Sequence, residues 1–138
     1  MTLRVFKTRT FARWTKRIAL TDAMLLTSVD DMRRGLLDAD LGGHVVKKRI
    51  ALPGLGKRGG ARALVATKLA ERWFFLYGFS KNEQGDINGR ALRGLQELAK
   101  ELLGFDETEL DIALAAGELV EVKHAQDGKA KPDPRGNP

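Results

Sequence analysis

The stretch HVVKKRIALPGLGKRGGARALVATKLAERWFFLYGFS, residues 44–80, contains three apolar segments separated by residues that favour turns. The segments at 44–52 and 72–80 are rich in β-branched or aromatic side chains, which favour strands. The composition of 61–70 fits a strand or a helix, and we predict a strand because glycines precede it and the aromatic segment follows closely. Short connections join antiparallel neighbours, so the stretch predicts a meander in which the glycine-rich loop links the first two strands.

The segments on either side of the meander have mainly helical patterns. Leu25, Val29 and Met32 recur at the spacing of one helix face, as do the apolar residues that follow Ile87. We expect a strand at 3–7, helices that begin at Thr10 and Thr21, a turn at 38–43, a helix from Asp86 to Gly104, a helix at 106–117 and a short last strand within 117–123. This order predicts an α+β fold: a small antiparallel β-sheet with the N-terminal helices and a C-terminal helical segment packed on one face of it.

The chain is expected to form one domain over residues 1–122. Residues 123–138 are polar and rich in Pro and Gly, so we expect them to form a disordered tail. The absence of cysteine excludes disulfides and thiolate metal sites, and the two histidines are far apart, so we expect neither a metal nor another cofactor. No apolar run approaches the roughly 18 residues of a membrane helix, and the N-terminal residues lack the apolar core of a secretory signal. These features predict a cytoplasmic protein without a membrane partner.

The positive charge is concentrated in the meander. Residues 44–72 carry eight lysines and arginines against one acid, Glu71, a local charge of 8 − 1 = +7. Such a segment is typical of proteins that bind polyanions, although a solvated hairpin tip has the same composition. A Walker-type phosphate loop is excluded, because Ala51 stands where its first glycine is required and Arg58 where Ser or Thr is required.

Strand alternation predicts where the cations lie. It places Arg62 on the same face of its strand as Leu64 and Ala66. It also places five residues of the last strand on a shared face: Trp73, Phe75, Tyr77, Phe79 and Lys81. Antiparallel pairing would bring Arg62 close to Lys81, which predicts a basic patch beside an aromatic platform. This combination binds phosphate and stacks bases.

These residues also carry a resemblance to a known family. The segments GKRGGARALV (56–65) and WFFLYGFSKNEQGDI (73–87), followed by an amphipathic helix, resemble the RelE/HigB branch of the RelE/ParE superfamily of bacterial type II toxin–antitoxin toxins. The resemblance extends over residues 3–103, and the ending LDIALAAGELVEVK resembles that of HigB-like members. It implies a RelE-like fold and an mRNA interferase, a ribosome-dependent endoribonuclease that inhibits translation by cutting mRNA in the A site.

The resemblance further implies a set of site residues. The implied catalytic residues are Lys57, Arg58, Arg62, Lys81 and Glu83, and the implied RNA-binding residues are Lys47, Lys48, Tyr77 and Asn82. In the implied metal-free reaction, the RNA 2′-hydroxyl attacks the adjacent phosphate while cations such as Arg62 stabilise the charge that develops. Glu83 is a candidate base, with an ordinary ion pair as its alternative. The acid and the base stay unassigned, because the segment after Asn82 lacks the tyrosine that some relatives carry.

The implied partners are a cognate antitoxin, the ribosome and mRNA. We expect the antitoxin to cover the basic face with acidic segments or with an added strand. Two other functions stay open: a ParE-like gyrase poison, and an RNA- or ribosome-binding module without catalysis. The glycine-rich basic cluster argues against the gyrase poison, whereas the missing tyrosine keeps the binding module open.

Overall fold

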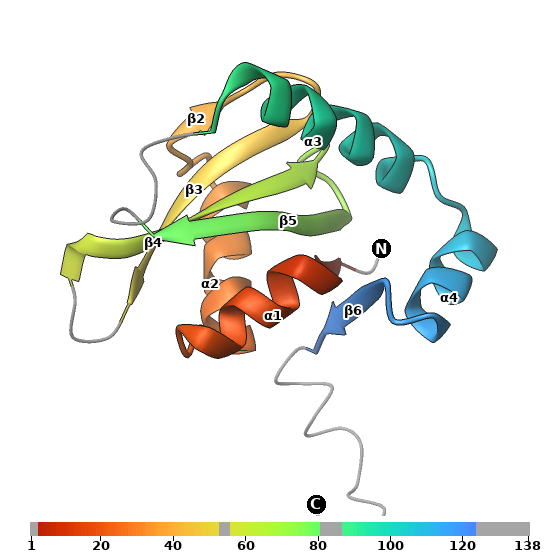
Figure 1. Ribbon diagram of the computed structural model, residues 1–138, viewed down its shortest axis with the longest axis horizontal. Coiled ribbons are helices and arrows are strands. Elements are labelled where there is room, and N and C mark those ends of the chain that lie inside the picture. The colour runs from red at the N-terminus through yellow and green to blue at the C-terminus, as the bar shows by residue number, and fades with distance from the viewer. Residues whose placement is uncertain (1–2, 53–55, 81–86, 124–138) are drawn as a thin grey trace, which may run out of the picture.

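The chain forms a six-stranded sheet with four helices in the computed structural model, which describes residues 3–52, 56–80 and 87–123, with 56–59 described in backbone only (Figure 1). In chain order the elements are β1 (Arg4–Thr8), α1 (Arg9–Arg17), α2 (Asp22–Arg33), β2 (Ala39–Asp40), β3 (Val45–Leu52), β4 (Gly56–Thr67), β5 (Arg72–Ser80), α3 (Gly89–Leu103), α4 (Glu107–Ala115) and β6 (Leu119–Val122). The strand order is β2-β3-β4-β5-β1-β6, and β1 runs parallel to β5 while the other neighbouring pairs are antiparallel. The predicted α+β class and the meander of β3, β4 and β5 are confirmed.

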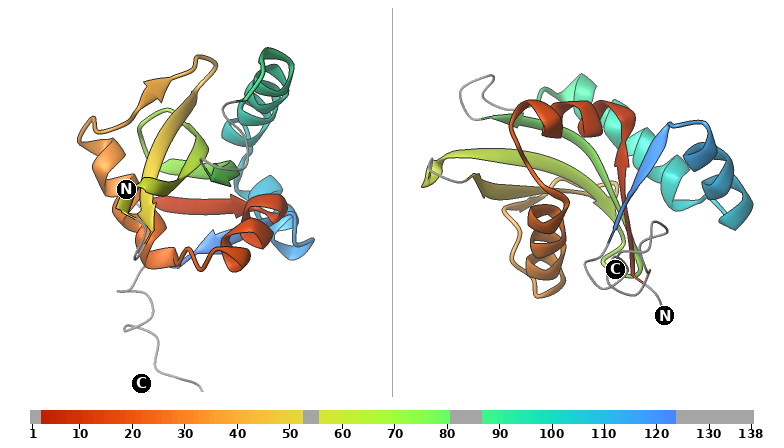
Figure 2. Two further views of the ribbon diagram at one scale, coloured as in Figure 1. Left: turned by 60° about the vertical axis from the view of Figure 1, so that its left-hand side comes forward. Right: turned by 90° about the horizontal axis from the view of Figure 1, so that it is seen from below.

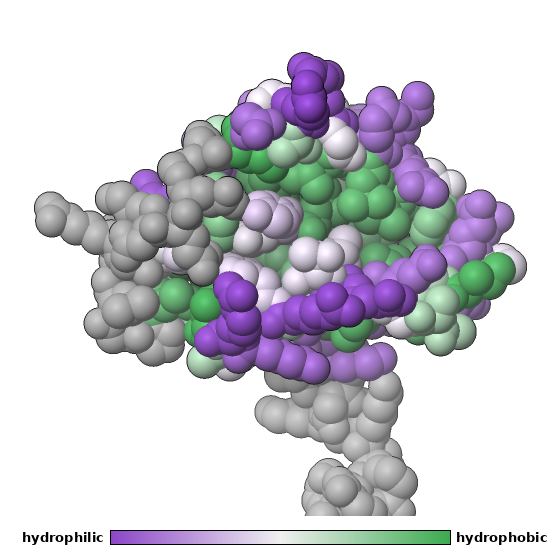
Figure 3. All heavy atoms as spheres, in the orientation of Figure 1, coloured by the Kyte–Doolittle hydropathy of each residue, from purple (hydrophilic) through white to green (hydrophobic). Residues whose placement is uncertain are grey.

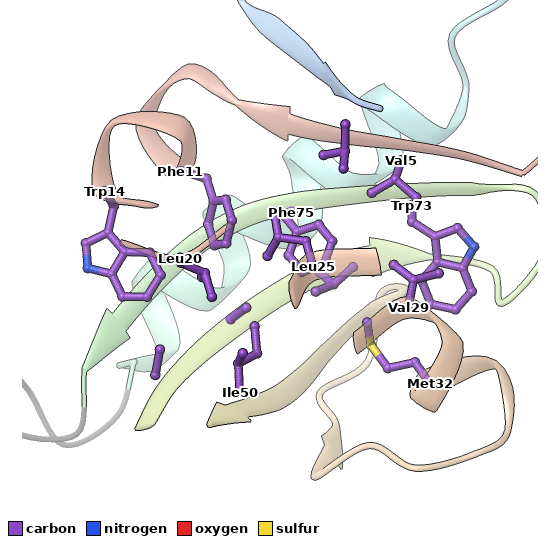
Figure 4. Close-up of a cluster of buried hydrophobic side chains, with 14 of the residues drawn as sticks. Val5, Phe11, Trp14, Leu20, Leu25, Val29, Met32, Ile50, Trp73 and Phe75 are labelled. Atoms are coloured by element: carbon purple, nitrogen blue, oxygen red, sulfur yellow. The ribbon is translucent and has the colours of Figure 1, made fainter. Parts of the chain in front are cut away.

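Helices cover both faces of the sheet, whereas we predicted that they cover one. The first face packs against α1 and α2 through a cluster that includes Phe11, Trp14, Leu25, Val29 and Phe75 (Figure 4). The second face packs against α3 and α4 through a cluster that includes Phe6, Leu64, Phe74, Ala99, Leu102 and Leu110. Figure 2 shows the sheet between α2 and α3. The prediction was wrong because the central strands have apolar residues on both sides, as in the run at 73–76, and such strands are buried on both faces.

The glycine-rich segment lies in a strand, not in the loop that we predicted. β4 begins at Gly56, and its pairs Leu52↔Gly56 and Ile50↔Ala61 leave residues 57–60 opposite the single residue Ala51. This irregularity is a large β-bulge. A Cβ on Gly60 would lie 2.6 Å from the backbone oxygen of Ile50, so glycine permits the two backbones to approach here.

Capping side chains mark the starts of α1 and α3. Thr8, and not Thr10, caps α1 by accepting a hydrogen bond of 3.1 Å from a backbone N–H of the first turn. Asn88 caps α3 in the same way at 2.8 Å, and the predicted start at Asp86 lies outside the described residues. The starts at Thr21 and at residue 106 are confirmed by capping side chains, and the predicted turn at 38–43 contains the short strand β2.

Acidic side chains of α4 and β6 attach the C-terminal elements to the sheet. Glu121 on β6 accepts two hydrogen bonds of 2.9 Å from Arg4 on β1. Glu107 on α4 forms ion pairs with Arg4 at 3.1 Å and with Arg72 on β5 at 2.7 Å. The hydrogen bond to Glu121 raises the pKa of Arg4 above its ordinary value, so the guanidinium stays charged. The acidic helix at 106–117 therefore has a structural role. The predicted tail lies outside the described residues, apart from Lys123.

Candidate nucleic-acid interface

Strand register places three cations on the face of the sheet that packs against α3. Arg62 on β4 lies opposite Arg49 on β3 and Phe79 on β5, and directly opposed residues share a face. Phe79 belongs to the cluster packed against α3 and α4, which identifies this face. Lys47 lies on it as well, because it is paired with Leu64 of the same cluster. We call this surface, defined by Lys47, Arg49 and Arg62, the cationic face; Arg49 was not among the predicted site residues.

One nitrogen of Arg62 is buried without a hydrogen-bond partner among the described residues. The side chain as a whole is half-buried, and its Nη1 makes no hydrogen bond to any residue that the structure describes. Leaving a buried charged donor unpaired costs more free energy than leaving a neutral one, because its lost hydration is not replaced. A phosphate oxygen is a well-matched acceptor, since a guanidinium binds phosphate with two parallel hydrogen bonds. Among the described residues, the guanidinium therefore has an unsatisfied donor of the kind that an anionic oxygen satisfies.

A β-bulge in β5 decides which aromatic rings lie beside these cations. The pairing of β5 with β4 shifts by one residue at Leu76. Before the bulge, Trp73 and Phe75 pack in the cluster of α1 and α2. After it, Tyr77 and Phe79 lie on the cationic face, with their ring centroids 6.2 Å apart. The prediction that all four aromatic rings share one face was wrong, because strict alternation does not continue across a bulge.

Lys48 lies on the opposite face from Arg62. Its Nζ donates a hydrogen bond of 3.0 Å to the carbonyl oxygen of Leu36 and forms an ion pair of 3.4 Å with Asp31 of α2. Its side chain is only 13% exposed. The structure thus separates Lys48 from the cationic face and gives it contacts that attach α2 to β3.

The remaining predicted residues are described in part or not at all. Lys57 and Arg58 belong to the bulged part of β4, where the backbone alone is described. Lys81, Asn82 and Glu83 lie outside the described residues. The last described residue before them, at position 80, is paired with position 61, directly next to Arg62 in the sequence. The roles of these five residues stay predictions.

Helix α1 contributes cations that were not among the predicted site residues. β1 pairs with β5 only as far as Phe75, and beyond this point α1 lies along β5, starting with a hydrogen bond of 2.9 Å from the hydroxyl of Thr8 to the carbonyl of Leu76. Figure 3 shows a band of hydrophilic side chains along α1 beside apolar and near-neutral surface between α1 and α3. The sequence indicated these cations only through the excess of basic over acidic residues in positions 1–20.

The described residues offer neither a metal site nor a membrane span. No group of three or more metal-ligating side chains is found among them, and none of their helices is both long and apolar enough to cross a bilayer.

Comparison with known proteins assigns the fold to a family. No curated protein matches the chain. A family model described as the RelE toxin of the RelE/RelB toxin–antitoxin system matches residues 3–122. The match extends over the sheet, the four helices described above and the cationic face. The chain therefore belongs to the RelE family, the toxins of toxin–antitoxin systems, whose partner is an antitoxin.

Proposed function

We propose that the chain is an endoribonuclease that cuts mRNA on the ribosome and so inhibits translation. The observation that carries the proposal is the buried Nη1 of Arg62, which has no hydrogen-bond partner among the described residues and lies on a face that also holds Arg49 and Tyr77. Single-stranded RNA fits such a face, because its phosphates bind cations and its bases stack on aromatic rings. Membership of the RelE family supports RNA cleavage, which is the general activity of that family.

The proposed reaction uses the RNA as its own nucleophile. The 2′-oxygen loses its proton and attacks the adjacent phosphorus, and the bond from phosphorus to the 5′-oxygen breaks. One fragment ends in a 2′,3′-cyclic phosphate, and the other gains a 5′-hydroxyl when its 5′-oxygen takes up a proton. Arg62 would stabilise the added negative charge of the pentacoordinate phosphorus through charged hydrogen bonds. Lys57, Lys81 and Glu83 are our candidates for moving the protons, with Arg58 as a further cation.

The test compares induced expression of the wild type with two Arg62 variants, with growth followed and mRNA 5′-ends mapped. We expect growth arrest and in-frame cuts from the wild type, and loss of both from Arg62→Ala. Arg62→Lys keeps the charge but loses the two-pronged geometry, so it should cut more slowly than the wild type. Arg33→Ala is the matched control, since Arg33 is an exposed arginine on α2.

Two results would contradict this proposal, and a third would move the decision to Arg62→Lys. Full cleavage by Arg62→Ala would refute the site. Arrest without cuts would instead indicate a poison that acts by binding, such as a gyrase inhibitor or a ribosome-binding module. A melting temperature of Arg62→Ala far below that of the wild type would show that lost activity reflects unfolding, and Arg62→Lys would then decide the question.

A further inference from the structure

We propose that the cavity between α1 and β5 binds one nucleotide of the RNA strand next to the phosphate held by Arg62. In this arrangement Arg13 contacts the backbone phosphate of that nucleotide and Tyr77 stacks on its base. The identity of the ligand as RNA rests on the proposed function, whereas the cavity and its charge do not.

The cavity is formed by two regular elements of the fold, α1 and β5. Its volume is about 530 Å³, within the roughly 300–1,000 Å³ that is typical of small-molecule sites. It is lined by Thr10, Arg13, Trp14 and Arg17 from α1 and by Tyr77, Gly78 and Phe79 from β5. It exists because α1, and not a strand, lies along β5 beyond Phe75.

The residues that line the cavity favour a negatively charged ligand that also contains an aromatic group. Among the residues that the structure describes, the lining includes two arginines and no acidic residue, and Arg13 is exposed at the surface of α1. A neighbouring cavity, of about 420 Å³, shares Thr10 and Arg13 with it, but Glu101 and Glu118 line it too. The charge therefore favours a polyanion in the cavity on β5 only. The half-buried ring of Tyr77 adds a stacking surface for a base.

Trp14 gives a second indication of a ligand. Its indole packs directly on Gly78, where a Cβ would lie 2.2 Å from Cζ3 of the ring. The side chain is 8% exposed, and its Nε1 is buried without a hydrogen-bond partner in the described part of the chain. Leaving a buried donor without an acceptor costs free energy, and a nucleotide carries acceptors that can approach it. The two unpaired buried nitrogens of the described residues thus belong to Trp14 and Arg62.

The cavity is continuous with the cationic face. Phe79 lines the cavity and lies directly opposite Arg62 in the sheet. A strand that places one phosphate on Arg62 can therefore place a neighbouring nucleotide between α1 and β5. The cavity would hold that nucleotide in register with the reacting phosphate.

The chain contains its own reporter for this site. Trp14 lines the cavity, while Trp73, the other tryptophan, is fully buried at the opposite end of the same core cluster (Figure 4). Tryptophan fluorescence of the purified toxin is titrated with a 2′-O-methyl trinucleotide, which cannot be cut because its nucleophile is blocked. An abasic trinucleotide with the same phosphates, and an acidic amphipathic peptide, are the comparison ligands.

We expect saturable quenching by the trinucleotide, with at least about tenfold weaker binding by Arg13→Gln, which loses a charged contact. Tyr77→Leu should also bind about tenfold more weakly, whereas Tyr77→Phe, which keeps the stacking ring, should bind like the wild type. Arg33→Gln changes the charge equally on α2 and should bind like the wild type. The abasic ligand should bind more weakly than the complete trinucleotide.

The proposal would be overturned by an absence of saturable quenching, by equal binding of the abasic ligand, or by an unchanged affinity of Arg13→Gln. Quenching by the acidic peptide alone would assign the cavity to a protein partner and overturn it as well. The assay uses neither ribosomes nor cleavage. Saturable binding by a chain that leaves mRNA intact would therefore support the nucleotide site in the cavity and refute the proposed nuclease activity. Cleavage of mRNA without quenching would support the nuclease activity and refute the nucleotide site.

Discussion

Replacing Gly78 with alanine should destabilise the fold by forcing Trp14 away from β5. The added Cβ would lie 2.2 Å from Cζ3, 2.4 Å from Cε3 and 2.8 Å from Cη2 of the indole. Ordinary contact begins at 3.4 Å, so the closest distance must lengthen by at least 3.4 − 2.2 = 1.2 Å. The indole has little room to move, because it is 8% exposed and packs against Phe11 with ring centroids 5.5 Å apart.

The expected loss of stability lies between two limits. Overpacking a core typically costs about 1–3 kcal/mol, and removal of a large buried aromatic side chain costs about 3–5 kcal/mol. Gly78→Ala adds one methyl group but displaces most of an indole, so we expect a loss of roughly 2–4 kcal/mol. For a domain of this size the loss corresponds to a melting temperature lower by roughly 10 °C.

Thermal and urea unfolding, followed by circular dichroism, would measure this loss. Gly94→Ala is the matched control: Gly94 is exposed inside α3 with no atom within 4 Å of an added Cβ, so alanine should stabilise by about 0.5–1 kcal/mol. The same Gly78→Ala change in a Trp14→Leu background should cost much less, because the clashing ring is gone. Equal losses in both backgrounds, or an unchanged melting temperature, would refute the reasoning.

Three further substitutions test the neighbouring strands β3 and β4. Lys48→Gln should lower the free energy of unfolding by about 1 kcal/mol while leaving mRNA cleavage intact, since Lys48 binds Asp31 on the opposite face. Arg49→Gln should slow cleavage without a change in melting temperature. If Lys48→Gln slowed cleavage and Arg49→Gln lowered stability instead, the assignment of faces would be contradicted. Gly60→Ala should destabilise the bulge, because its Cβ would meet the backbone oxygen of Ile50 at 2.6 Å, and should slow cleavage as well. Unfolding curves and mRNA 5′-end mapping of Gly60→Ala test this prediction. Wild-type stability together with wild-type cleavage would show that the bulge does not require glycine.

Several elements could be predicted from local sequence because local chemistry decides them. β5 has the predicted bounds, since its unbroken run of bulky apolar side chains at 73–76 favours a strand in almost any context. α2 and α4 begin where predicted, because Thr21 and Asp106 cap the first turn within the same segment of chain. The start of α1 was missed by two residues, since Thr8 and Thr10 are equally suitable caps and only the end of β1 distinguishes them.

The sequence by itself determined the α+β class, the central meander and the choice of Arg62 as the residue around which the candidate site is built. Only the tertiary structure decided what surrounds Arg62. The bulge at Leu76 keeps only Tyr77 and Phe79 of the four aromatic residues on its face. The register of β3 brings Arg49 there and directs Lys48 toward α2. Cross-strand register and the position of a bulge depend on partners distant in the chain, so a local pattern contains no information about them. The contribution of α1 has the same origin, because its place beside β5 follows from where β1 stops pairing.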